Sequence, residues 1–313
     1  MQDWKILLTD GLEQTGQELL RCDCQLENRE GISAADLLDV IDQYDAMIVR
    51  GRTRVTAQVL QAGKKLRVVG RAGVGVDNID LAAATRQQVI VVNSPLATTQ
   101  AVAEYTLGLI LALARSLPRA DATMKAGLWL KKEFQGIEVH GKTLGVIGMG
   151  QIGSAVSRRA AAMGMQIVGY DPLIPGDEIA RRGAEPVSLA ELYQRSDFVS
   201  VHVPLTPETK GLLTGQSFAQ MKRGVRLVCT ARGHIMDETT LLGALETGQV
   251  AGAALDVFAS EPPGLTGLVS HPNVIATPHI AAQTIEAQSR AAEDIAQEVL
   301  AALRGAPLRW RIV

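Results

Sequence analysis

Residues 143–153 read Thr-Leu-Gly-Val-Ile-Gly-Met-Gly-Gln-Ile-Gly, and this stretch decides the fold. The apolar run Thr143–Ile147 predicts a buried strand, and small or apolar side chains at three- to four-residue steps from Ile152 to Met163 predict a helix. The turn between them contains three glycines in Gly-x-Gly-x-x-Gly spacing, Gly148, Gly150 and Gly153. In such a unit the glycines permit a tight turn, close approach of backbone to a pyrophosphate, and packing of helix on strand.

An acidic residue follows the next predicted strand, Gln166–Tyr170. The carboxylate of Asp171 can accept hydrogen bonds from both ribose hydroxyls of NAD. A 2′-phosphate there would lie near a like charge, at a cost of about 4 kcal/mol per charge pair at 4 Å and an effective dielectric of 20. Tyr170-Asp171-Pro172 supplies no neighbouring arginine to offset that cost. The sequence therefore predicts NAD, with its phosphates at the N-terminus of the helix that follows the glycines.

Short apolar runs alternate with helical patterns along most of the chain, which predicts right-handed βαβ crossovers and parallel sheets. The predicted strands are, in chain order, Lys5–Thr9, Ala46–Val49, Arg67–Val69, Val89–Val92, Thr143–Ile147, Gln166–Tyr170, Phe198–His202, Leu227–Thr230 and Gly252–Val257. One long apolar helix, Thr98–Leu117, interrupts the series between Pro95 and Pro118. A last helix, about Thr284–Leu303, can return the chain to the first domain.

We therefore predict an α/β protein with two doubly wound parallel-sheet domains. A Rossmann cofactor domain, residues 96–280, is inserted in a flavodoxin-like substrate domain made of residues 1–95 and 281–313. The composition agrees, because 47% hydrophobic residues with only 4% aromatics and 30 glycines suit aliphatic parallel strands joined by tight turns.

Charge and cysteine content exclude several classes of protein. The 31 basic and 33 acidic residues give a net charge of −2. The sequence contains no Lys/Arg-rich block, so we do not expect it to bind nucleic acid. The three cysteines, Cys22, Cys24 and Cys229, are too few and too sparse to predict a disulfide framework. The five histidines are dispersed along the sequence, so we expect no metal site. The longest apolar stretch, Leu107–Ala114, is shorter than the roughly 18 residues that cross a bilayer. We expect a cytoplasmic protein with no membrane partner.

Three residues after predicted strands suggest chemistry on a 2-hydroxy acid. Such a reaction needs a cation for the carboxylate, an acid/base for the hydroxyl proton, and a group that orients that base. Arg232 can grip a carboxylate with two hydrogen bonds, His279 titrates near neutral pH, and Glu261 can fix the tautomer of a histidine. All three follow predicted strands, where open α/β sheets bind their ligands.

The chain resembles the NAD-dependent D-2-hydroxyacid dehydrogenase family, most closely its D-3-phosphoglycerate dehydrogenase branch. The resemblance spans nearly the whole chain and rests on ordered motifs. These are Arg71-Ala72-Gly73-Val74-Gly75-Val76-Asp77-Asn78, Val102-Ala103-Glu104-Tyr105-Thr106, Gly141-Lys142-Thr143-Leu144-Gly145, Thr230-Ala231-Arg232-Gly233, Gly252-Ala253-Ala254-Leu255-Asp256-Val257-Phe258, Glu261-Pro262-Pro263 and Thr277-Pro278-His279.

The resemblance implies a role for each matching residue. His279 is then the proton donor and acceptor, Glu261 its partner, and Arg232 the arginine that binds the substrate's carboxylate and carbonyl. The implied coenzyme contacts, besides the glycines, are Gln151, Ile152, Asp171, Thr230, Ala231 and Asp256. Backbone amides at Val74 and Gly75 are expected to cradle the substrate carboxylate, and Arg50 its phosphate. Family likeness also implies a homodimer through the cofactor domain.

The expected reaction is oxidation of D-3-phosphoglycerate to 3-phosphohydroxypyruvate, a step of serine biosynthesis. Two alternatives remain: a glyoxylate or hydroxypyruvate reductase, which would not need Arg50, and an NAD-sensing binding protein like the family's transcriptional corepressors. His234 replaces the family's usual second glycine after the arginine, beside the expected site. Because the sequence stops at Val313, we expect no C-terminal serine-sensing domain and no feedback through one.

Overall fold

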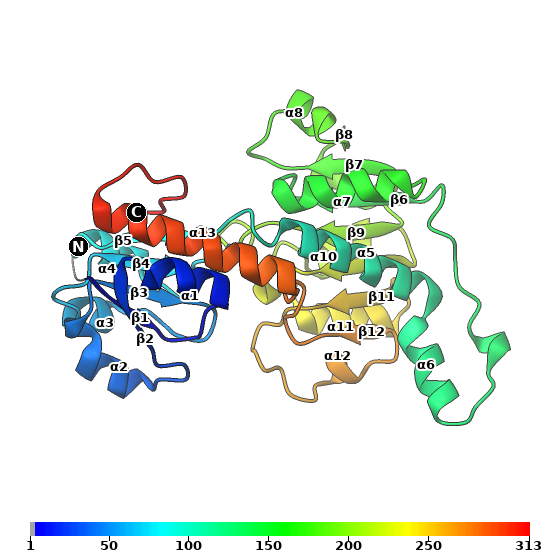
Figure 1. Cartoon of the computed structure of the whole chain (residues 1–313). Coiled ribbons are helices and arrows are strands. Elements are labelled where there is room, and N and C mark those ends of the chain that lie inside the picture. The colour runs from blue at the N-terminus through cyan, green and yellow to red at the C-terminus, as the bar shows by residue number, and fades with distance from the viewer. Residues whose placement is uncertain (1–3) are drawn as a thin grey trace. The chain divides into compact units, whose positions relative to one another are not determined.

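The computed structural model describes residues 4–313 and divides into two compact units. Unit 1 ends at Thr99 and resumes over Gln283–Val313, whereas unit 2 is Gln100–Ala282. The boundaries expected from the sequence, after residues 95 and 280, fall slightly earlier. Figure 1 shows each unit as a sheet with helices packed on it.

Unit 1 is built on a five-stranded parallel sheet in the order β2-β1-β3-β4-β5, which is the flavodoxin-like order. Its strands are β1 (Trp4–Leu8), β2 (Cys24–Asn28), β3 (Ala46–Val49), β4 (Val68–Arg71) and β5 (Ile90–Asn93). The sequence missed β2, because this strand lies at the sheet edge and its exposed polar residues Gln25, Glu27 and Asn28 hide the apolar pattern.

The helices of unit 1 are α1 (Gln14–Arg21), α2 (Ala34–Val40), η1 (Ile41–Gln43), α3 (Ala57–Ala62), α4 (Leu81–Arg86) and α13 (Ile285–Arg304). The last helix thus lies within one residue of the predicted range, and the hydroxyl of Thr284 caps it by accepting a hydrogen bond from the Ala287 amide at 3.1 Å. Helix α13 packs directly on β4, where a Cβ at Gly70 would lie 2.6 Å from the Val299 side chain. The fold therefore requires glycine at residue 70.

The segment after α13 pairs with the outer strand of the same sheet. Residues Val92 and Arg311 form an antiparallel bridge, and the amide of Ile312 donates to the Val91 carbonyl at 2.8 Å. Glu298, only 2% exposed on α13, accepts hydrogen bonds from the Arg309 and Trp310 amides and from the Arg309 side chain. This buried carboxylate anchors the C-terminal segment on unit 1.

Unit 2 is built on a seven-stranded parallel sheet in the order β12-β11-β10-β9-β6-β7-β8, which extends the Rossmann order by one strand. Its strands are β6 (Thr143–Ile147), β7 (Gln166–Tyr170), β8 (Glu185–Pro186), β9 (Phe198–Val201), β10 (Val225–Cys229), β11 (Val250–Leu255) and β12 (Val274–Ala276). The predicted fold class is confirmed. The predicted strands match or shift by one or two residues, and only the short or peripheral β2, β8 and β12 were missed.

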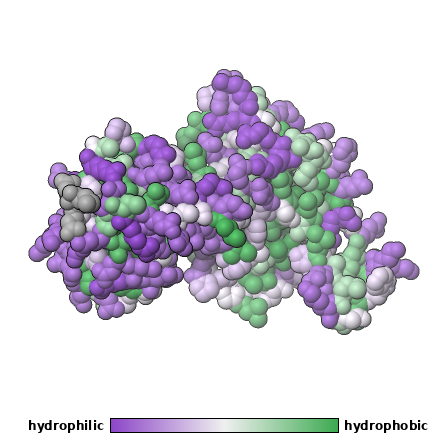
Figure 2. Space-filling view, in the orientation of Figure 1, coloured by the Kyte–Doolittle hydropathy of each residue, from purple (hydrophilic) through white to green (hydrophobic). Residues whose placement is uncertain are grey.

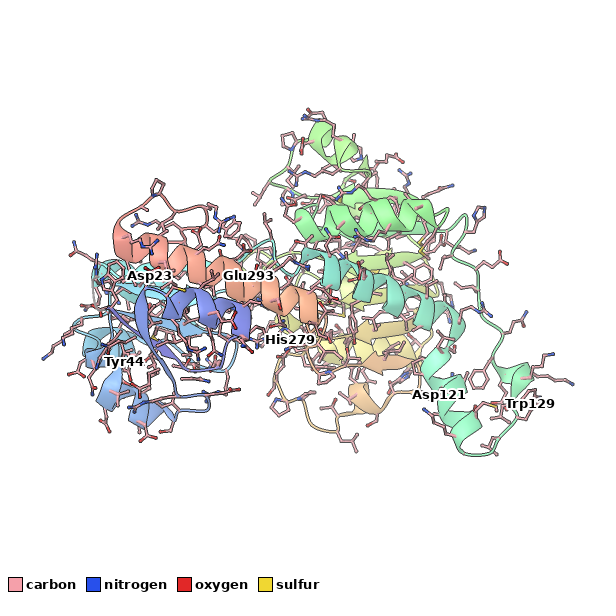
Figure 3. The ribbon with its side chains drawn as sticks, viewed as in Figure 1. Asp23, Tyr44, Asp121, Trp129, His279 and Glu293 are labelled. Atoms are coloured by element: carbon pink, nitrogen blue, oxygen red, sulfur yellow. The ribbon has the colours of Figure 1, made fainter. Side chains whose placement is uncertain are left out.

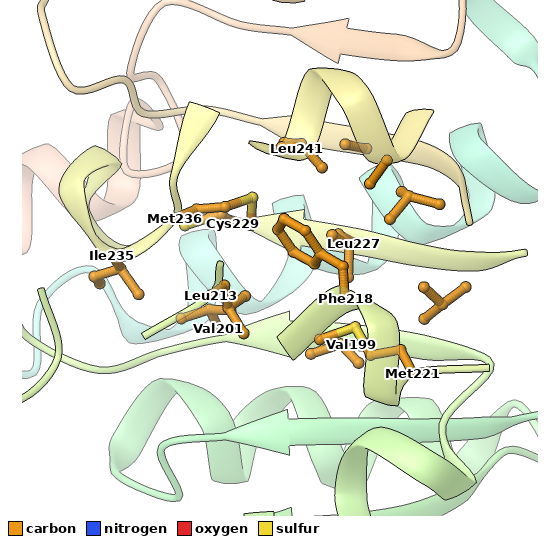
Figure 4. Close-up of a cluster of buried hydrophobic side chains, with 14 of the residues drawn as sticks. Val199, Val201, Leu213, Phe218, Met221, Leu227, Cys229, Ile235, Met236 and Leu241 are labelled. Carbon is orange, nitrogen blue, oxygen red and sulfur yellow. The ribbon is translucent and has the colours of Figure 1, made fainter. Parts of the chain in front are cut away.

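The helices of unit 2 are α5 (Thr99–Arg115), α6 (Leu117–Lys125), η2 (Lys131–Glu133), α7 (Gln151–Ala162), α8 (Gly176–Arg181), α9 (Leu189–Arg195), α10 (Gly215–Gln220), η3 (Gly233–Ile235), α11 (Glu238–Glu246) and α12 (Gly267–Ser270). Mostly aliphatic side chains fill the core of the unit. Figure 4 shows part of this core, where Phe218 of α10 and Met221, directly after that helix, pack with Val199 and Leu227 of the sheet.

The predicted helix Thr98–Leu117 is wrong at its C-terminal end. Helix α5 stops at Arg115, Ser116 adopts a left-handed φ of 52°, and α6 starts at Leu117. Pro118 does not terminate a helix but stands in the first turn of the new one, where its missing N–H costs nothing. Among residues 4–313 no single helix is long and apolar enough to cross a membrane. Only the pair α5 and α6, bent by 65°, has the length and composition together.

Large apolar side chains are exposed on α6 and the segment that follows it. Leu117, Met124, Leu128 and Trp129 are each at least half exposed, and Trp129 reaches 78%. Figure 3 places Asp121 and Trp129 on a part of unit 2 that projects from its sheet, and Figure 2 shows hydrophobic surface over the same unit. We call residues 116–139 the arm.

Candidate active site

The glycine turn between β6 and α7 has the geometry that a dinucleotide requires. Gly148 has a φ of 92°, and a Cβ there would lie 2.6 Å from the His202 carbonyl oxygen. A Cβ at Gly153 would lie 1.9 Å from the Gly148 carbonyl oxygen, so helix and turn touch there. At Gly150, in contrast, a Cβ would meet no protein atom within 4 Å. The open space at Gly150, beside the first amides of α7, fits a pyrophosphate.

Asp171 follows β7 and is bonded to the glycine turn. One carboxylate oxygen accepts the Met149 amide and the other accepts the Leu173 amide, both at 2.9 Å. Each oxygen has a second lone pair that can accept a ribose hydroxyl. The structure therefore holds Asp171 in place without using up its capacity to accept hydrogen bonds.

An arginine that the local sequence did not indicate also contacts this turn. Arg182, just past α8, donates to the Met149 carbonyl at 2.8 Å and to Glu178 at 2.7 Å. The hydrogen bond from Arg182 lowers the pKa of Glu178, so this carboxyl is ionised at neutral pH. Tyr170-Asp171-Pro172 contains no arginine, as expected, but Arg182 reaches the same glycine turn from the end of α8. Its charge is balanced by the ion pair with Glu178 at 2.7 Å.

The structure brings His279 and Glu261 together. The Nδ1 atom of His279, labelled in Figure 3, lies 2.8 Å from Oε2 of Glu261. The other oxygen of Glu261 accepts the Phe258 amide at 3.1 Å, which fixes the carboxylate. Both side chains are partly exposed, at 49% and 39%. With Nδ1 engaged, Nε2 is the ring nitrogen that can exchange a proton with a ligand.

Arg232 lies on a neighbouring loop of the same sheet edge. It follows β10, and its Nη1 donates to the Ala231 carbonyl at 2.7 Å. The next residue, Gly233, approaches the loop that carries Glu261 so closely that a Cβ would lie 2.0 Å from the Phe258 backbone. Only glycine permits this contact, which sets the Arg232 loop against the Glu261 loop.

Two further predicted coenzyme contacts are already engaged within the protein. The Thr230 hydroxyl is buried and lies 3.2 Å from the hydroxyl of Thr106 on α5. Asp256, fully buried after β11, accepts hydrogen bonds from Thr277, Ile280 and Ala281. The sequence could not show these internal partners, because they lie far away along the chain.

The remaining predicted residues lie in unit 1, after β3 and β4. Arg50 contacts Gln288 of α13 through its guanidinium and lies 4.0 Å from Glu13. Its backbone amide donates to Asp10 at 2.8 Å. Val74 is partly exposed, and its carbonyl accepts from Asn93 at 2.7 Å. Since β3 and β4 are neighbouring parallel strands, Arg50 and the Val74–Gly75 loop lie at the same edge of the sheet.

Two histidines outside this group differ in environment. Burial lowers the pKa of His202 to about 4, and its Nε2 lies 2.7 Å from the Ser200 hydroxyl, so the ring is neutral at pH 7 and structural. His234 is exposed, and its carbonyl accepts the Gly211 amide at 2.9 Å. Over residues 4–313, no cluster of His, Cys, Asp and Glu side chains could hold a metal ion.

Comparisons with known proteins agree with this geometry. A family model described as D-isomer specific 2-hydroxyacid dehydrogenase, NAD binding domain, matches residues 107–281. The D-3-phosphoglycerate dehydrogenase of Synechocystis sp. is 45% identical over 97% of this chain and 55% of that protein. The protein of that name from Rattus norvegicus is 47% identical over 97% of this chain and 57% of its own length. This chain therefore spans little more than half the length of these curated relatives.

A solved structure is similar over its full length. The glyoxylate reductase from Paecilomyes thermophila superposes with a TM-score of 0.92 and 30% sequence identity, covering 100% of this chain and 99% of that one.

Proposed function

This chain belongs to the D-isomer specific 2-hydroxyacid dehydrogenase family and contains its NAD-binding domain, and on that premise we propose that it interconverts a D-2-hydroxy acid and the corresponding 2-keto acid. The observation that carries the proposal is the 2.8 Å contact between His279 and Glu261, at the sheet edge that also presents Arg232 and the glycine turn. We propose D-3-phosphoglycerate as the substrate, the compound in the names of the curated relatives.

The glycine turn and Asp171 would hold NAD, which would supply the acceptor for the hydride of C2 of the hydroxy acid. His279 takes the hydroxyl proton at Nε2, while Glu261 holds the ring at Nδ1 and stabilises the imidazolium. In the reverse direction His279 returns this proton to the keto oxygen. Met149, Gly150 and the first turn of α7 bind the phosphates, and Asp171 binds the adenosine ribose.

Arg232 is proposed to bind the substrate carboxylate, the role that the family resemblance also gives to the Val74–Gly75 amides of unit 1. A guanidinium donates two parallel hydrogen bonds to a carboxylate, which fixes the plane of the bound acid. Unit 1 then acts as the substrate domain and unit 2 as the coenzyme domain.

Arg50 is proposed to bind the phosphate of the substrate. Its present side-chain partners, Gln288 and the partly exposed Glu13 at 4.0 Å, hold it only through neutral or long contacts. A dianionic phosphate is a stronger partner for a guanidinium than either of these.

Substrate-panel kinetics test this assignment. We expect kcat/KM for 3-phosphohydroxypyruvate to exceed that for hydroxypyruvate and glyoxylate, and Arg50→Gln to lower the first about tenfold or more while sparing the others. Arg86→Gln, at an exposed arginine that ends α4 of the same unit, is the matched control. Equal losses on all three substrates, or a parent enzyme that prefers glyoxylate, would favour the reductase alternative, which the similarity to a glyoxylate reductase keeps open.

We also propose a homodimer through unit 2. The arm exposes Leu117, Met124, Leu128 and Trp129, and monomeric proteins rarely leave such a run of large apolar side chains in water. A second copy that covers the arm would bury them. Sedimentation velocity at micromolar concentration should give a dimer, and Trp129→Ser with Leu128→Ser should shift it toward monomer. A monomeric parent would contradict the proposal.

A cytoplasmic location is proposed on the chemistry of the cysteines. Cys22, Cys24 and Cys229 are all free thiols, as a reducing compartment keeps them. Cell fractionation followed by thiol titration of the isolated protein checks this, with three reactive thiols expected after unfolding. Recovery of a disulfide-linked form from cells would argue against it.

A further inference from the structure

The loop that carries His279 needs support, because its backbone is unusual. His279 has a φ of 53°, in the left-handed region that non-glycine residues seldom adopt. Its amide donates to the carbonyls of Asp256 and Thr277, at 2.9 and 3.0 Å. Such a conformation persists only where surrounding contacts impose it.

The carboxylate of Asp256 supplies most of these contacts. Its Oδ1 accepts the Thr277 hydroxyl at 2.7 Å and the Ile280 amide at 2.9 Å, and its Oδ2 accepts the Ala281 amide at 2.8 Å. The side chain is fully buried, so these donors replace water around an ionised group. The loop from Thr277 to Ala281 is thus wrapped around one carboxylate, with His279 at its centre.

The hydroxyl of Thr277 is the one side-chain donor among these contacts. A carboxylate can only accept, so Thr277 donates its single hydroxyl proton to Asp256. The other two donors to Asp256, at Ile280 and Ala281, are backbone amides that a side-chain substitution leaves in place. Thr277 is therefore the position at which the hydrogen bonds of Asp256 can be tested by mutation.

We propose that Thr277 is a positioning residue, which holds His279 in its working orientation by completing the hydrogen bonds of Asp256. This inference rests on the proposed function, in which His279 exchanges the proton of the substrate. The Thr277 side chain is not proposed to touch substrate or coenzyme. Its effect is on the placement of Nε2, and a displacement of about 1 Å from a reacting atom can cost a hundredfold in rate.

Two variants test the role of Thr277 by kinetics. Thr277→Val keeps the shape of the side chain and removes the hydroxyl, and we expect kcat to fall about ten- to a hundredfold with little change in the KM for NADH. Thr277→Ser restores a hydroxyl, so its kcat should return to within a few-fold of the parent.

The matched controls lie elsewhere in unit 2. Thr247→Val removes a hydroxyl that bonds only to carbonyls of its own helix end, and Tyr193→Phe removes a phenol hydroxyl from the core beneath α9. Both should keep the parental kcat. Circular dichroism and melting temperature identify any variant that fails to fold, and the Thr277→Ser result then decides between loss of the hydroxyl and loss of packing.

A spectroscopic readout separates this inference from the proposed function. In protein labelled with [13C,15N]-histidine, the His279 ring signal, identified by its loss in His279→Gln, should move or broaden in Thr277→Val and remain in place in Thr277→Ser. If the parent turns over no 2-keto acid, the proposed function fails, and this signal still reports on the loop. An unchanged His279 signal in Thr277→Val, or parental kcat in that variant, would overturn the positioning role.

Discussion

The two units hold their functional loops with the same device, a buried aspartate. In unit 1, Asp10 after β1 accepts the amides of Arg50 and Thr53 and the Thr53 hydroxyl, and so shapes the loop after the neighbouring strand β3. In unit 2, Asp256 after β11 does the same for the loop after β12, which carries His279.

The difference lies in what balances the negative charge. Asp10 has an ion pair with Arg52 at 3.1 Å, and the Arg52 side chain is 51% exposed. For Asp256, the part of the chain from residue 4 to 313 supplies hydrogen-bond donors but no ion-pair partner within 4.0 Å. Unit 1 therefore presents a cation on a loop whose anchor is buried but paired with a half-exposed arginine, whereas unit 2 presents a proton carrier on a loop whose anchor is held by hydrogen-bond donors alone. An anchor without a solvated charged partner fixes the geometry of its loop more rigidly, as proton transfer requires.

The largest expected effect concerns the residue that the unit 2 loop presents. His279→Ala should lower kcat by about 10²- to 10⁴-fold, the usual contribution of a general acid–base, while NADH binding measured by fluorescence stays near that of the parent. His140→Gln, an exposed histidine of the same unit, is the control. Near-parental turnover in His279→Ala would remove the distinction between the two loops.

The next effect compares the anchors themselves. Asp256→Ala leaves three donors without their acceptor in a dry site and should lower the free energy of unfolding by on the order of 4 kcal/mol. Asp10→Ala should cost less, about 2 kcal/mol, because Arg52, the half-exposed partner of Asp10, can be hydrated in the variant. Urea denaturation gives the totals, and hydrogen exchange of residues 277–281 and 50–53 gives the local effects. A larger cost at Asp10 would reverse the comparison.

A pH effect should be specific to unit 2. Burial lowers the pKa of His202 to about 4, from an ordinary value near 6.5. As the pH falls, the unfolded chain therefore binds a proton at a higher pH than the folded chain does. Unit 2 should therefore lose up to about 3 kcal/mol as the pH falls from 6.5 to 4, with no loss from this group above 6.5.

In His202→Asn, the stability of unit 2 should depend less on pH between 6.5 and 4. Hydrogen exchange of the unit 2 strands measures this stability, with unit 1 as the internal reference. An unchanged slope in the variant would show that other groups cause the acid sensitivity.

The smallest effect compares helix caps of the two units. Ser33 caps α2 through the Asp36 amide, whereas Ser188 caps α9 in a reciprocal box with Glu191. Each serine-to-alanine change should cost about 1 kcal/mol, and Ser188→Ala slightly more, because the box satisfies two amides. Thermal unfolding of both variants measures the difference, and a clearly larger cost for Ser33→Ala would contradict it.

Local pattern predicted much of the fold. The strands β3, β6 and β7 match their predicted ranges to the residue, because continuous apolar runs and flanking turns mark buried parallel strands. Edge strands such as β2 lack a continuous apolar run, because part of their surface is exposed to water. The break at Ser116 was missed because a proline that stops one helix can equally start another.

The candidate site also contains residues that the sequence could predict and contacts that it could not. Residue types after strands indicated Arg232, Glu261 and His279, and the structure places the last two in contact. The partners of Asp256 and the contact of Arg182 with Met149 could not be predicted, because those bonds join residues that only the folded sheet brings together. Hydrogen bonds between distant segments leave no periodic signal in a sequence.

The C-terminal segment that Glu298 anchors has a consequence for solubility. Residues 310–313 occupy the hydrogen-bonding edge of β5, an edge that would otherwise offer unpaired amides and carbonyls to any extended chain nearby. The C-terminal segment therefore covers the β5 edge of unit 1, so this edge cannot pair with the strands of other molecules. Loss of the Glu298 anchor, or cleavage within residues 305–308, would detach this segment. The edge of β5 would then be exposed and could pair with strands of other molecules.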